Sequence, residues 1–157
     1  MKQNSRIAIV ILMIIISFSA CKEDNYIDWK VKNELWLEKN KTQPGVVTTA
    51  SGLQYKIIDE GWSYNRKPSR SSDTYVKYTG GLINDSTFES AKTITKISLW
   101  DPRVIEGWKE GLPKIHDGGS IILYIPSNLG YGKDGSGTSI PPYSTLIFKI
   151  DLESSDN

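Results

Sequence analysis

Apolar and polar residues alternate along several segments in the C-terminal part of the chain, a pattern typical of strands that bury one face. The clearest segment covers residues 145–153, in which nearly every second residue is a large apolar one. Alternation at residues 53–57 and 74–79, a less regular pattern at 93–99 and an apolar run at 121–125 predict further strands. This part of the chain is therefore expected to form a β-sheet with one buried face.

Residues 25–41 show the spacing of a helix instead, with apolar residues on two sides. Ile27, Val31 and Leu35 recur every fourth residue on one face, and Trp29 and Trp36 lie on nearly the opposite face. Such a helix is expected to contact its own domain, a partner or a second copy, and packing on its own domain is favoured. Pro44 and Gly45 end the segment, so a chain that starts near Thr49 is expected to fold alone.

A second, shorter helix is predicted between Pro102 and Pro113. Pro102 suits the first turn of a helix, because its missing N–H is not needed there. The apolar residues at helical spacing are Val104, Ile105, Trp108 and Leu112. One short helix among several strands predicts an α+β fold, in which an antiparallel sheet curls over the helix. Residues 126–142 form a long loop between the last two strands, and such a loop usually carries function.

The composition narrows the class of protein. The chain has 157 residues, enough for one domain, with 19 basic and 18 acidic residues. Without a basic excess, no nucleic-acid partner is expected. One cysteine excludes an internal disulfide, and one cysteine with one histidine is a poor basis for a zinc site. His116 is expected to be a surface or partly buried residue without a catalytic role. Five Trp, eight Tyr and three Phe favour an aromatic core or pocket.

The first twenty residues have the pattern of a secretory signal peptide. Two basic residues precede an apolar run at residues 7–16, which is too short to span a bilayer as a helix. Ser19 and Ala20 are followed directly by Cys21. This arrangement resembles a bacterial lipobox, in which the cysteine is acylated and becomes the mature N-terminus. The alternative is a plain signal peptide followed by an unrelated cysteine.

The predicted organisation is a lipoprotein signal peptide at residues 1–20, a lipid-anchored linker and helical arm at 21–49, and one domain at 50–157. Lys22, Glu23 and Asp24 follow the cysteine. They resemble the charged tag of some Bacteroidetes surface lipoproteins, although an ordinary linker explains them equally well. The expected location is the outer membrane, facing the periplasm or the cell surface.

Six segments resemble, in order and spacing, the bacterial FKBP-type peptidyl-prolyl cis-trans isomerases. They are Ser51–Tyr55, Val76–Gly80, Thr87–Ser90, Val104–Leu112, Leu129–Gly132 and Ile140–Phe148. The fourth is close to V-I-x-G-W-x-E-G-L and the last to I-P-P-x-A-T-L-I-F. The match covers residues 50–153 and implies the FKBP-like fold, a curled antiparallel sheet around one short helix, here preceded by the helical arm.

The resemblance also implies an activity, which is rotation about X-Pro amide bonds in polypeptide clients. No bond is broken, so no nucleophile, metal or cofactor is required, and macrolide inhibitors are possible ligands. Trp108 would form the pocket floor, and Ile140 would lie against the peptide. The Ile105 N–H and the Tyr131 hydroxyl would donate to the peptide's carbonyls. The walls implied by the resemblance are Tyr78, Phe88, Val104, Ile105 and Phe148, with the carboxylate of Glu89 beside them.

Three positions depart from the family pattern. Glu89 replaces the usual aspartate, Thr95 replaces an aromatic residue, and Ser139 replaces an apolar one. These changes bear on the catalytic rate and on macrolide affinity more than on the fold. They leave open a non-catalytic peptide-binding or chaperone module, which would use the pocket or the arm with its two tryptophans. A purely structural lipoprotein would not explain why the aromatic residues occupy family positions.

Overall fold

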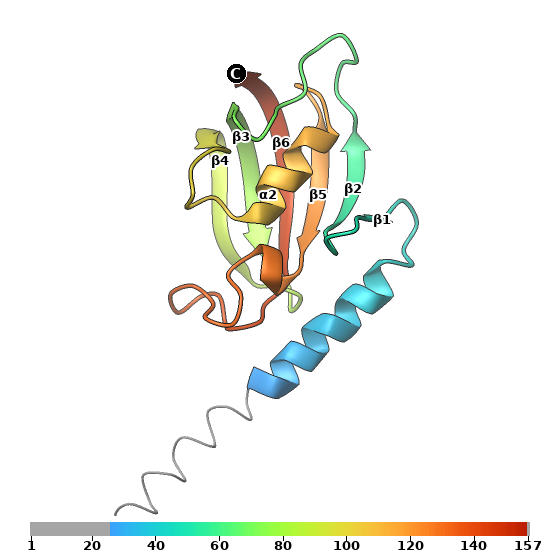
Figure 1. Cartoon of the computed structure of the whole chain (residues 1–157), viewed down its shortest axis with the longest axis vertical. Coiled ribbons are helices and arrows are strands. Elements are labelled where there is room, and N and C mark those ends of the chain that lie inside the picture. The colour runs from blue at the N-terminus through green and yellow to red at the C-terminus, as the bar shows by residue number, and fades with distance from the viewer. Residues whose placement is uncertain (1–25, 157) are drawn as a thin grey trace, which may run out of the picture.

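Residues 26–156, which a computed structural model of the chain describes, contain a six-stranded antiparallel sheet in the order β1-β2-β5-β6-β3-β4 (Figure 1). The strands are β1 Val47–Thr48, β2 Gln54–Asp59, β3 Asp73–Gly81, β4 Thr87–Ser98, β5 Ser120–Ile125 and β6 Leu146–Asp156. The signal peptide, Cys21 and the charged residues 22–24 lie outside the described residues. The curled antiparallel sheet confirms the predicted fold class.

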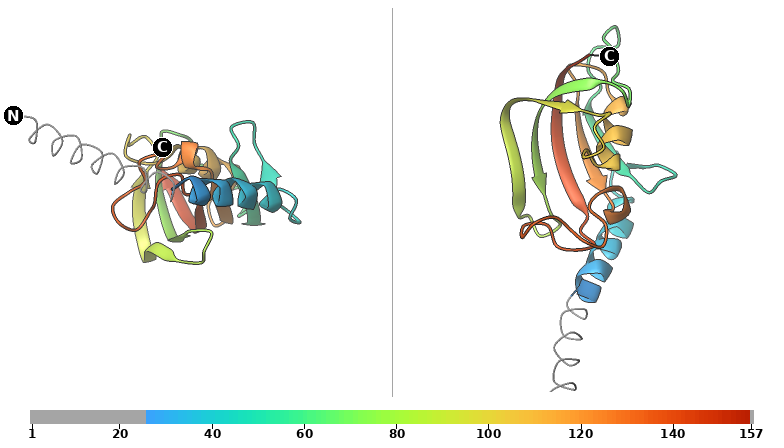
Figure 2. Two further views of the ribbon diagram at one scale, coloured as in Figure 1. Left: turned by 90° about the horizontal axis from the view of Figure 1, so that it is seen from below. Right: turned by 60° about the vertical axis from the view of Figure 1, so that its left-hand side comes forward.

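Helix α2, Glu106–Gly111, lies across the concave face of this sheet and continues into a 3₁₀ turn, η1, at Leu112–Lys114. Figure 2 shows the curved sheet from the side, with the helix on one face only. A second 3₁₀ turn, η2, covers Ser127–Leu129 in the long loop before β6. The predicted helix between Pro102 and Pro113 is therefore present, although its regular part is shorter.

The core fills the space between α2 and the central strands. Alternate residues of β6 are buried, as the sequence pattern predicts, and Leu146, Phe148, Ile150 and Leu152 are at most 3% exposed. On α2, Gly107 and Gly111 face the sheet so closely that a Cβ atom at either would lie 2.5 Å from a side-chain carbon of β5. Only glycine allows this approach, which brings Trp108 and Leu112 into the core.

Strand β4 begins earlier than the alternation predicts, at Thr87 instead of residue 93. Most side chains in its first half are exposed, so no buried face marks this half in the sequence. The pairing with β3 also shifts, because Val76 lies opposite Thr95 while Tyr78 lies opposite Ala91. This irregularity in the pairing interrupts the alternation.

The N-terminal helix, residues 26–40 in the described part of the chain, runs beside the domain (Figure 1). Its tryptophan face packs inward, and the rings of Trp36 and Tyr124 lie 5.7 Å apart. Asn33 and Asn40 on this side are 2% and 8% exposed. The opposite face remains open to solvent, with Ile27, Val31 and Leu35 all at least 45% exposed. The helix therefore packs on its own domain. No helix within residues 26–156 is long and apolar enough to cross a membrane.

Candidate active site

Four aromatic rings from four different elements form one cluster on the concave side of the sheet. Tyr78 comes from β3, Phe88 from β4, Trp108 from α2 and Phe148 from β6. The Trp108 ring meets Tyr78 at 5.0 Å and Phe148 at 5.2 Å between ring centroids, both edge to face. Phe88 meets Phe148 edge to face at 5.5 Å. Edge-to-face contacts between aromatic rings are favourable and directional, so each ring limits the rotation of the next.

A cavity of about 150 Å³ opens beside this cluster. One water needs only about 10–15 Å³ by such a measure, so the cavity has room for a small ring. Its lining residues are Tyr78, Glu89, Ile97, Arg103, Val104, Ile105, Trp108, Tyr131 and Phe148. The long loop, the start of α2 and three strands therefore converge on one largely apolar pocket.

Two residues expected at the pocket lie elsewhere in the cluster and core. Phe88 is partly buried and packs edge to face with Phe148, so it supports the wall without lining the cavity. Ile140 is 7% exposed, belongs to the core and pairs with Ser136 in a short bridge of the loop. Both residues hold the shape of the site from outside the cavity.

Two lining residues, Ile97 and Arg103, were not anticipated from the sequence. Thr95, which the resemblance places where the family has an aromatic residue, lies opposite Val76 and does not line the cavity, whereas Ile97 does. Ile97 is two positions further on the same strand and thus faces the same side, a spacing that could have found it. Arg103 carries no sequence signal, because a charged residue before an apolar helix start is common.

Hydrogen bonding at the pocket involves Tyr78, Glu89 and Tyr131. The Tyr78 hydroxyl donates to Glu89 Oε1 at 2.6 Å. Burial, helped by this bond to a carboxylate, raises the pKa of Tyr78 far above its ordinary value. Burial also raises the pKa of Tyr131, and the nearby Glu89 charge adds to the effect. Both hydroxyls are therefore protonated at neutral pH and can act as donors.

The donors expected to meet a peptide are free to do so. Among the described residues, no group accepts a hydrogen bond from the Tyr131 hydroxyl, which is 36% exposed at the pocket mouth. Ile105 precedes the first turn of α2, where backbone N–H groups have no partner within the helix. Its carbonyl accepts from Trp108 N–H at 3.1 Å, which ties the pocket floor to this turn.

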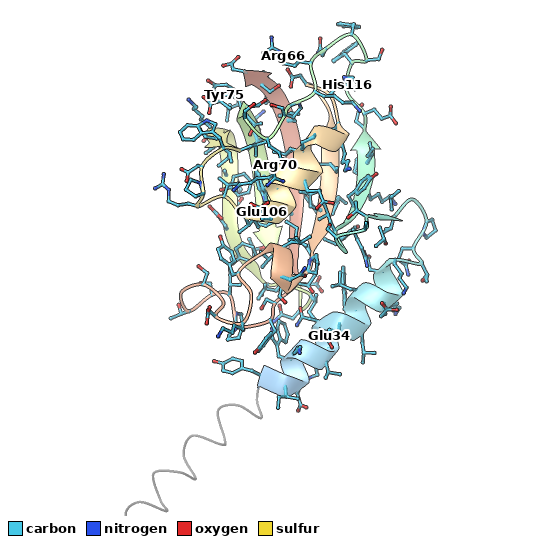
Figure 3. All side chains as sticks on the ribbon, viewed as in Figure 1. Glu34, Arg66, Arg70, Tyr75, Glu106 and His116 are labelled. Atoms are coloured by element: carbon cyan, nitrogen blue, oxygen red, sulfur yellow. The ribbon has the colours of Figure 1, made fainter. Side chains whose placement is uncertain are left out.

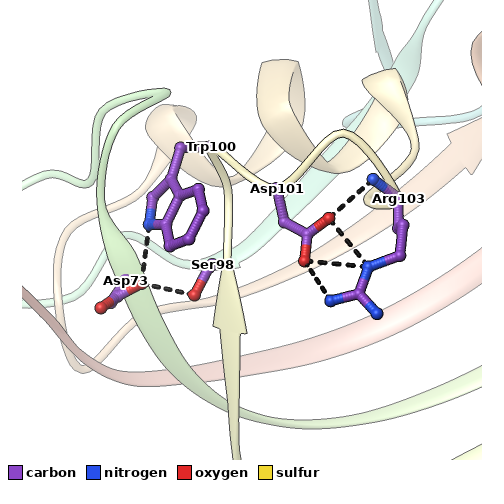
Figure 4. Close-up of polar contacts among 5 residues, drawn as sticks. All are labelled: Asp73, Ser98, Trp100, Asp101 and Arg103. Atoms are coloured by element: carbon purple, nitrogen blue, oxygen red, sulfur yellow. Dashed lines mark hydrogen bonds and ion pairs between the residues drawn. The ribbon is translucent and has the colours of Figure 1, made fainter.

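The rim between β4 and α2 is held by two carboxylates (Figure 4). Asp101 accepts from the guanidinium of Arg103 through both oxygens, and this pairing lowers the pKa of Asp101 to about 2. Asp73 accepts from the Ser98 hydroxyl at 2.5 Å and from the Trp100 indole N–H at 3.1 Å. The chain that leads into the pocket is thus fixed on both sides of Trp100.

Outside the pocket, Glu106 on α2 pairs with Arg70 and with Lys109, which joins the helix to the loop before β3 (Figure 3). His116 is partly buried, and its Nδ1 lies 2.8 Å from the Asn65 carbonyl oxygen. It contributes nothing to the cavity lining. No group of three or more His, Cys, Asp or Glu suited to a metal ion occurs in the stretch 26–156.

These features define a class of protein, an α+β domain with a largely apolar aromatic pocket and hydrogen-bond donors beside it. Comparison with known proteins places the chain in a family. The model for FKBP-type peptidyl-prolyl cis-trans isomerases matches residues 64–153, and the model for the domain amino terminal to such isomerases matches residues 13–57. The chain belongs to the FKBP-type peptidyl-prolyl cis-trans isomerase family, as the six sequence segments predict.

Several relatives and solved structures are similar to it. The probable isomerase FkpA of Neisseria meningitidis serogroup B is 40% identical over 124 residues, which are 78% of this chain and 45% of that protein. The outer membrane protein MIP of Legionella longbeachae is 41% identical over 124 residues, 78% of this chain and 52% of that protein. The crystal structure of FkpA from Escherichia coli superimposes with a TM-score of 0.80 and 35% identity, covering 88% of this chain and 64% of that one. The chain spans about half the length of the curated relatives it matches.

Proposed function

We propose that this protein is a peptidyl-prolyl cis-trans isomerase that accelerates rotation about X-Pro bonds in polypeptides of the cell envelope. The observation that carries the proposal is the pocket floored by Trp108, in which an apolar cavity and the Tyr131 hydroxyl lie side by side. A proline ring fits the apolar part, while the flanking carbonyls meet the donors. Proline-containing segments of unfolded or partly folded chains are the corresponding substrates.

The chemistry follows from the amide bond itself. Resonance sets a rotation barrier of about 18–20 kcal/mol, and unassisted X-Pro rotation takes about tens to hundreds of seconds. A twisted amide loses conjugation and much of its dipole, so an apolar pocket suits it better than water does. Interactions that are stronger in the twisted state than in the planar one lower the barrier. The Trp108 and Phe148 rings hold the proline, and Tyr131 and the Ile105 N–H donate to the carbonyl groups as they move.

An isomerisation assay tests this function. The chain without its first 21 residues should speed cis-to-trans conversion of an X-Pro peptide, and neither a chelator nor a thiol reagent should inhibit it. Macrolide inhibitors should compete for the same pocket. If the folded protein leaves the rate at its uncatalysed value for several residues before the proline, the isomerase proposal fails. Retained peptide binding in that case would support the non-catalytic peptide-binding module instead.

The proposed location is the outer membrane, through a lipid on Cys21. Its support is the sequence around Cys21 and one relative that is itself named an outer membrane protein. Several acyl chains are needed for stable anchoring, since one chain binds membranes only marginally. Cys21→Ala should abolish labelling with a fatty-acid analogue and release the protein from membrane fractions. A variant that still labels and sediments with membranes would contradict the lipid anchor.

A further inference from the structure

Two residues of the N-terminal helix hold the end of the long loop that leads into β6. The Trp29 indole N–H donates to Ser144 Oγ at 2.9 Å, and Ser144 Oγ donates to the Pro141 carbonyl at 2.7 Å. Asn33 Oδ1 accepts from the backbone N–H of Thr145 at 2.7 Å. These contacts join positions more than a hundred residues apart in the sequence.

Asn33 is unusual for its place in a helix. Asparagine is a weak helix former, yet this one is 2% exposed and uses both ends of its amide. Its Nδ2 donates to the Trp29 carbonyl at 2.8 Å, so the two anchoring residues also hold each other. Thr145 is 1% exposed, and a buried backbone N–H without a partner is costly. Helix propensity does not explain an asparagine at position 33. Its hydrogen bond to the backbone of the loop end does.

The anchored loop end continues to the active site. Tyr143, the residue before Ser144, donates its backbone N–H to the Gly132 carbonyl at 2.8 Å, and Gly132 directly follows Tyr131. Tyr143 has a φ of 61°, a left-handed conformation that residues with a Cβ rarely adopt. Such a conformation persists where its surroundings hold it. Here Lys30 Nζ lies 5.3 Å from the centroid of the Tyr143 ring, so the helix contacts this strained corner as well.

We infer that the N-terminal helix is a positioning element for the active site, in which Trp29 and Asn33 hold residues 143–145 and thereby set the place of the Tyr131 hydroxyl. The inference rests on the proposed isomerase function. It makes Trp29 and Asn33 positioning residues, because neither of them lines the cavity. Since a typical neutral hydrogen bond is worth about fivefold in rate, loss of this positioning should cost about two- to fivefold in kcat/KM.

The other end of the same helix provides a matched control. Asn40 Nδ2 donates to Gln54 Oε1 at 2.9 Å, and Gln54 Nε2 donates to the Leu37 carbonyl at 3.0 Å. Asn40 is 8% exposed, so Asn40→Ala also removes a buried amide from the interface between helix and domain. Its partner lies on β2 and has no described contact with the long loop. Asn33→Ala thus removes a contact with the end of the long loop, whereas Asn40→Ala removes a contact with β2.

The test compares both variants in the chain from residue 22 onward, at a temperature where each is folded. Both should melt at lower temperature than the wild type. Asn33→Ala should lower kcat/KM about two- to fivefold, whereas Asn40→Ala should stay within the error of the wild type. In a Tyr131→Phe background, Asn33→Ala should cause no further loss, and it should change kcat and KM in the same proportion as Tyr131→Phe does. Trp29→Phe, which removes the indole N–H but keeps a smaller aromatic ring, replaces Asn33→Ala in the test if that variant does not fold.

Two results would overturn the inference. One is an Asn33→Ala enzyme that melts lower but keeps the wild-type kcat/KM, and the other is an equal loss with and without the Tyr131 hydroxyl. An inactive wild type would refute the isomerase function separately. Hydrogen exchange tests the contact between the N-terminal helix and residues 143–145 without a substrate. The amides of Tyr143 and Thr145 should lose protection in Asn33→Ala and keep it in Asn40→Ala. Wild-type protection of both amides in Asn33→Ala would show that the helix does not hold the loop.

Discussion

The two sides of the pocket are built in different ways. The floor and inner walls come from α2 and the central strands, and their main residues, Trp108 and Phe148, are 4% and 3% exposed. The loop side presents Tyr131, which is 36% exposed and stands between glycines. Apolar packing holds the first side, whereas backbone hydrogen bonds and two side chains of a distant helix hold the second. One pocket thus combines an apolar floor fixed by core packing with a polar side whose loop end is hydrogen-bonded to a helix far away in the sequence.

The largest effect is expected at the floor. Phe148→Ala should leave a cavity between Trp108 and Phe88 and reduce the free energy of unfolding by about 3–5 kcal/mol. Chemical denaturation measures this loss, and activity should be compared only under conditions where the variant is folded. A loss below about 1 kcal/mol would mean that the aromatic cluster contributes little to the core, and the contrast between the two sides would fail.

Removal of the N-terminal arm tests how much its contacts with the domain contribute to stability. A chain that starts at Thr49 should still unfold cooperatively, because every buried apolar residue of the described core lies after Thr49, and Trp29 of the arm only packs against them. It loses four hydrogen bonds between the N-terminal helix and the domain, each worth about 1 kcal/mol net. The melting temperature should therefore fall by at least about 10 °C, as calorimetry would measure. An unchanged melting temperature would mean that the helix is only loosely attached.

Ligand binding is expected to depend on one residue of β4, in the pocket wall between the floor and the long loop. Ile97 lines the cavity and Thr95 does not, so Ile97→Ala should weaken peptide or macrolide binding about fivefold through lost apolar contact. Thr95→Ala, and equally Thr95→Phe, should leave the dissociation constant within about twofold. Titration calorimetry measures both. Tighter binding by Thr95→Phe would show that Thr95 reaches the ligand after all.

The smallest expected effect is a pH-dependent change in melting temperature caused by the ion pair at the pocket rim. Arg103 lowers the pKa of Asp101 from 3.8 to about 2 in the folded state. Because the folded pKa is the lower one, the ionised carboxylate stabilises the fold above the unfolded pKa, and this contribution is lost as the pH falls toward 2. Asp101→Asn should thus melt slightly below the wild type at pH 6, with the difference shrinking between pH 4 and pH 2. A difference that is constant with pH would assign the effect to packing.

The hydrophobic pattern predicted the strands that form the core, because alternation follows directly from which face is buried. It predicted β6 and β5 well and shortened β4, in whose first half most side chains are exposed. The motif spacing predicted the family and most of the cavity lining, including Trp108, Tyr131 and Glu89. It did not separate residues that line the cavity from those behind it, such as Phe88, since that depends on how neighbouring rings are oriented in space.

By itself, the sequence determined the α+β class, the family and the aromatic content of the pocket, because these follow from local periodicity and from motifs of a few residues. Spacing along β4 makes Ile97 and Thr95 equal candidates for the wall, and only the tertiary structure decided that Ile97 lines the cavity. It also decided the contacts of Asn33, a buried polar residue of a helix that no local pattern explains. Its partner, Thr145, lies 112 residues away in the sequence, and contacts over such distances arise only when the whole chain has folded.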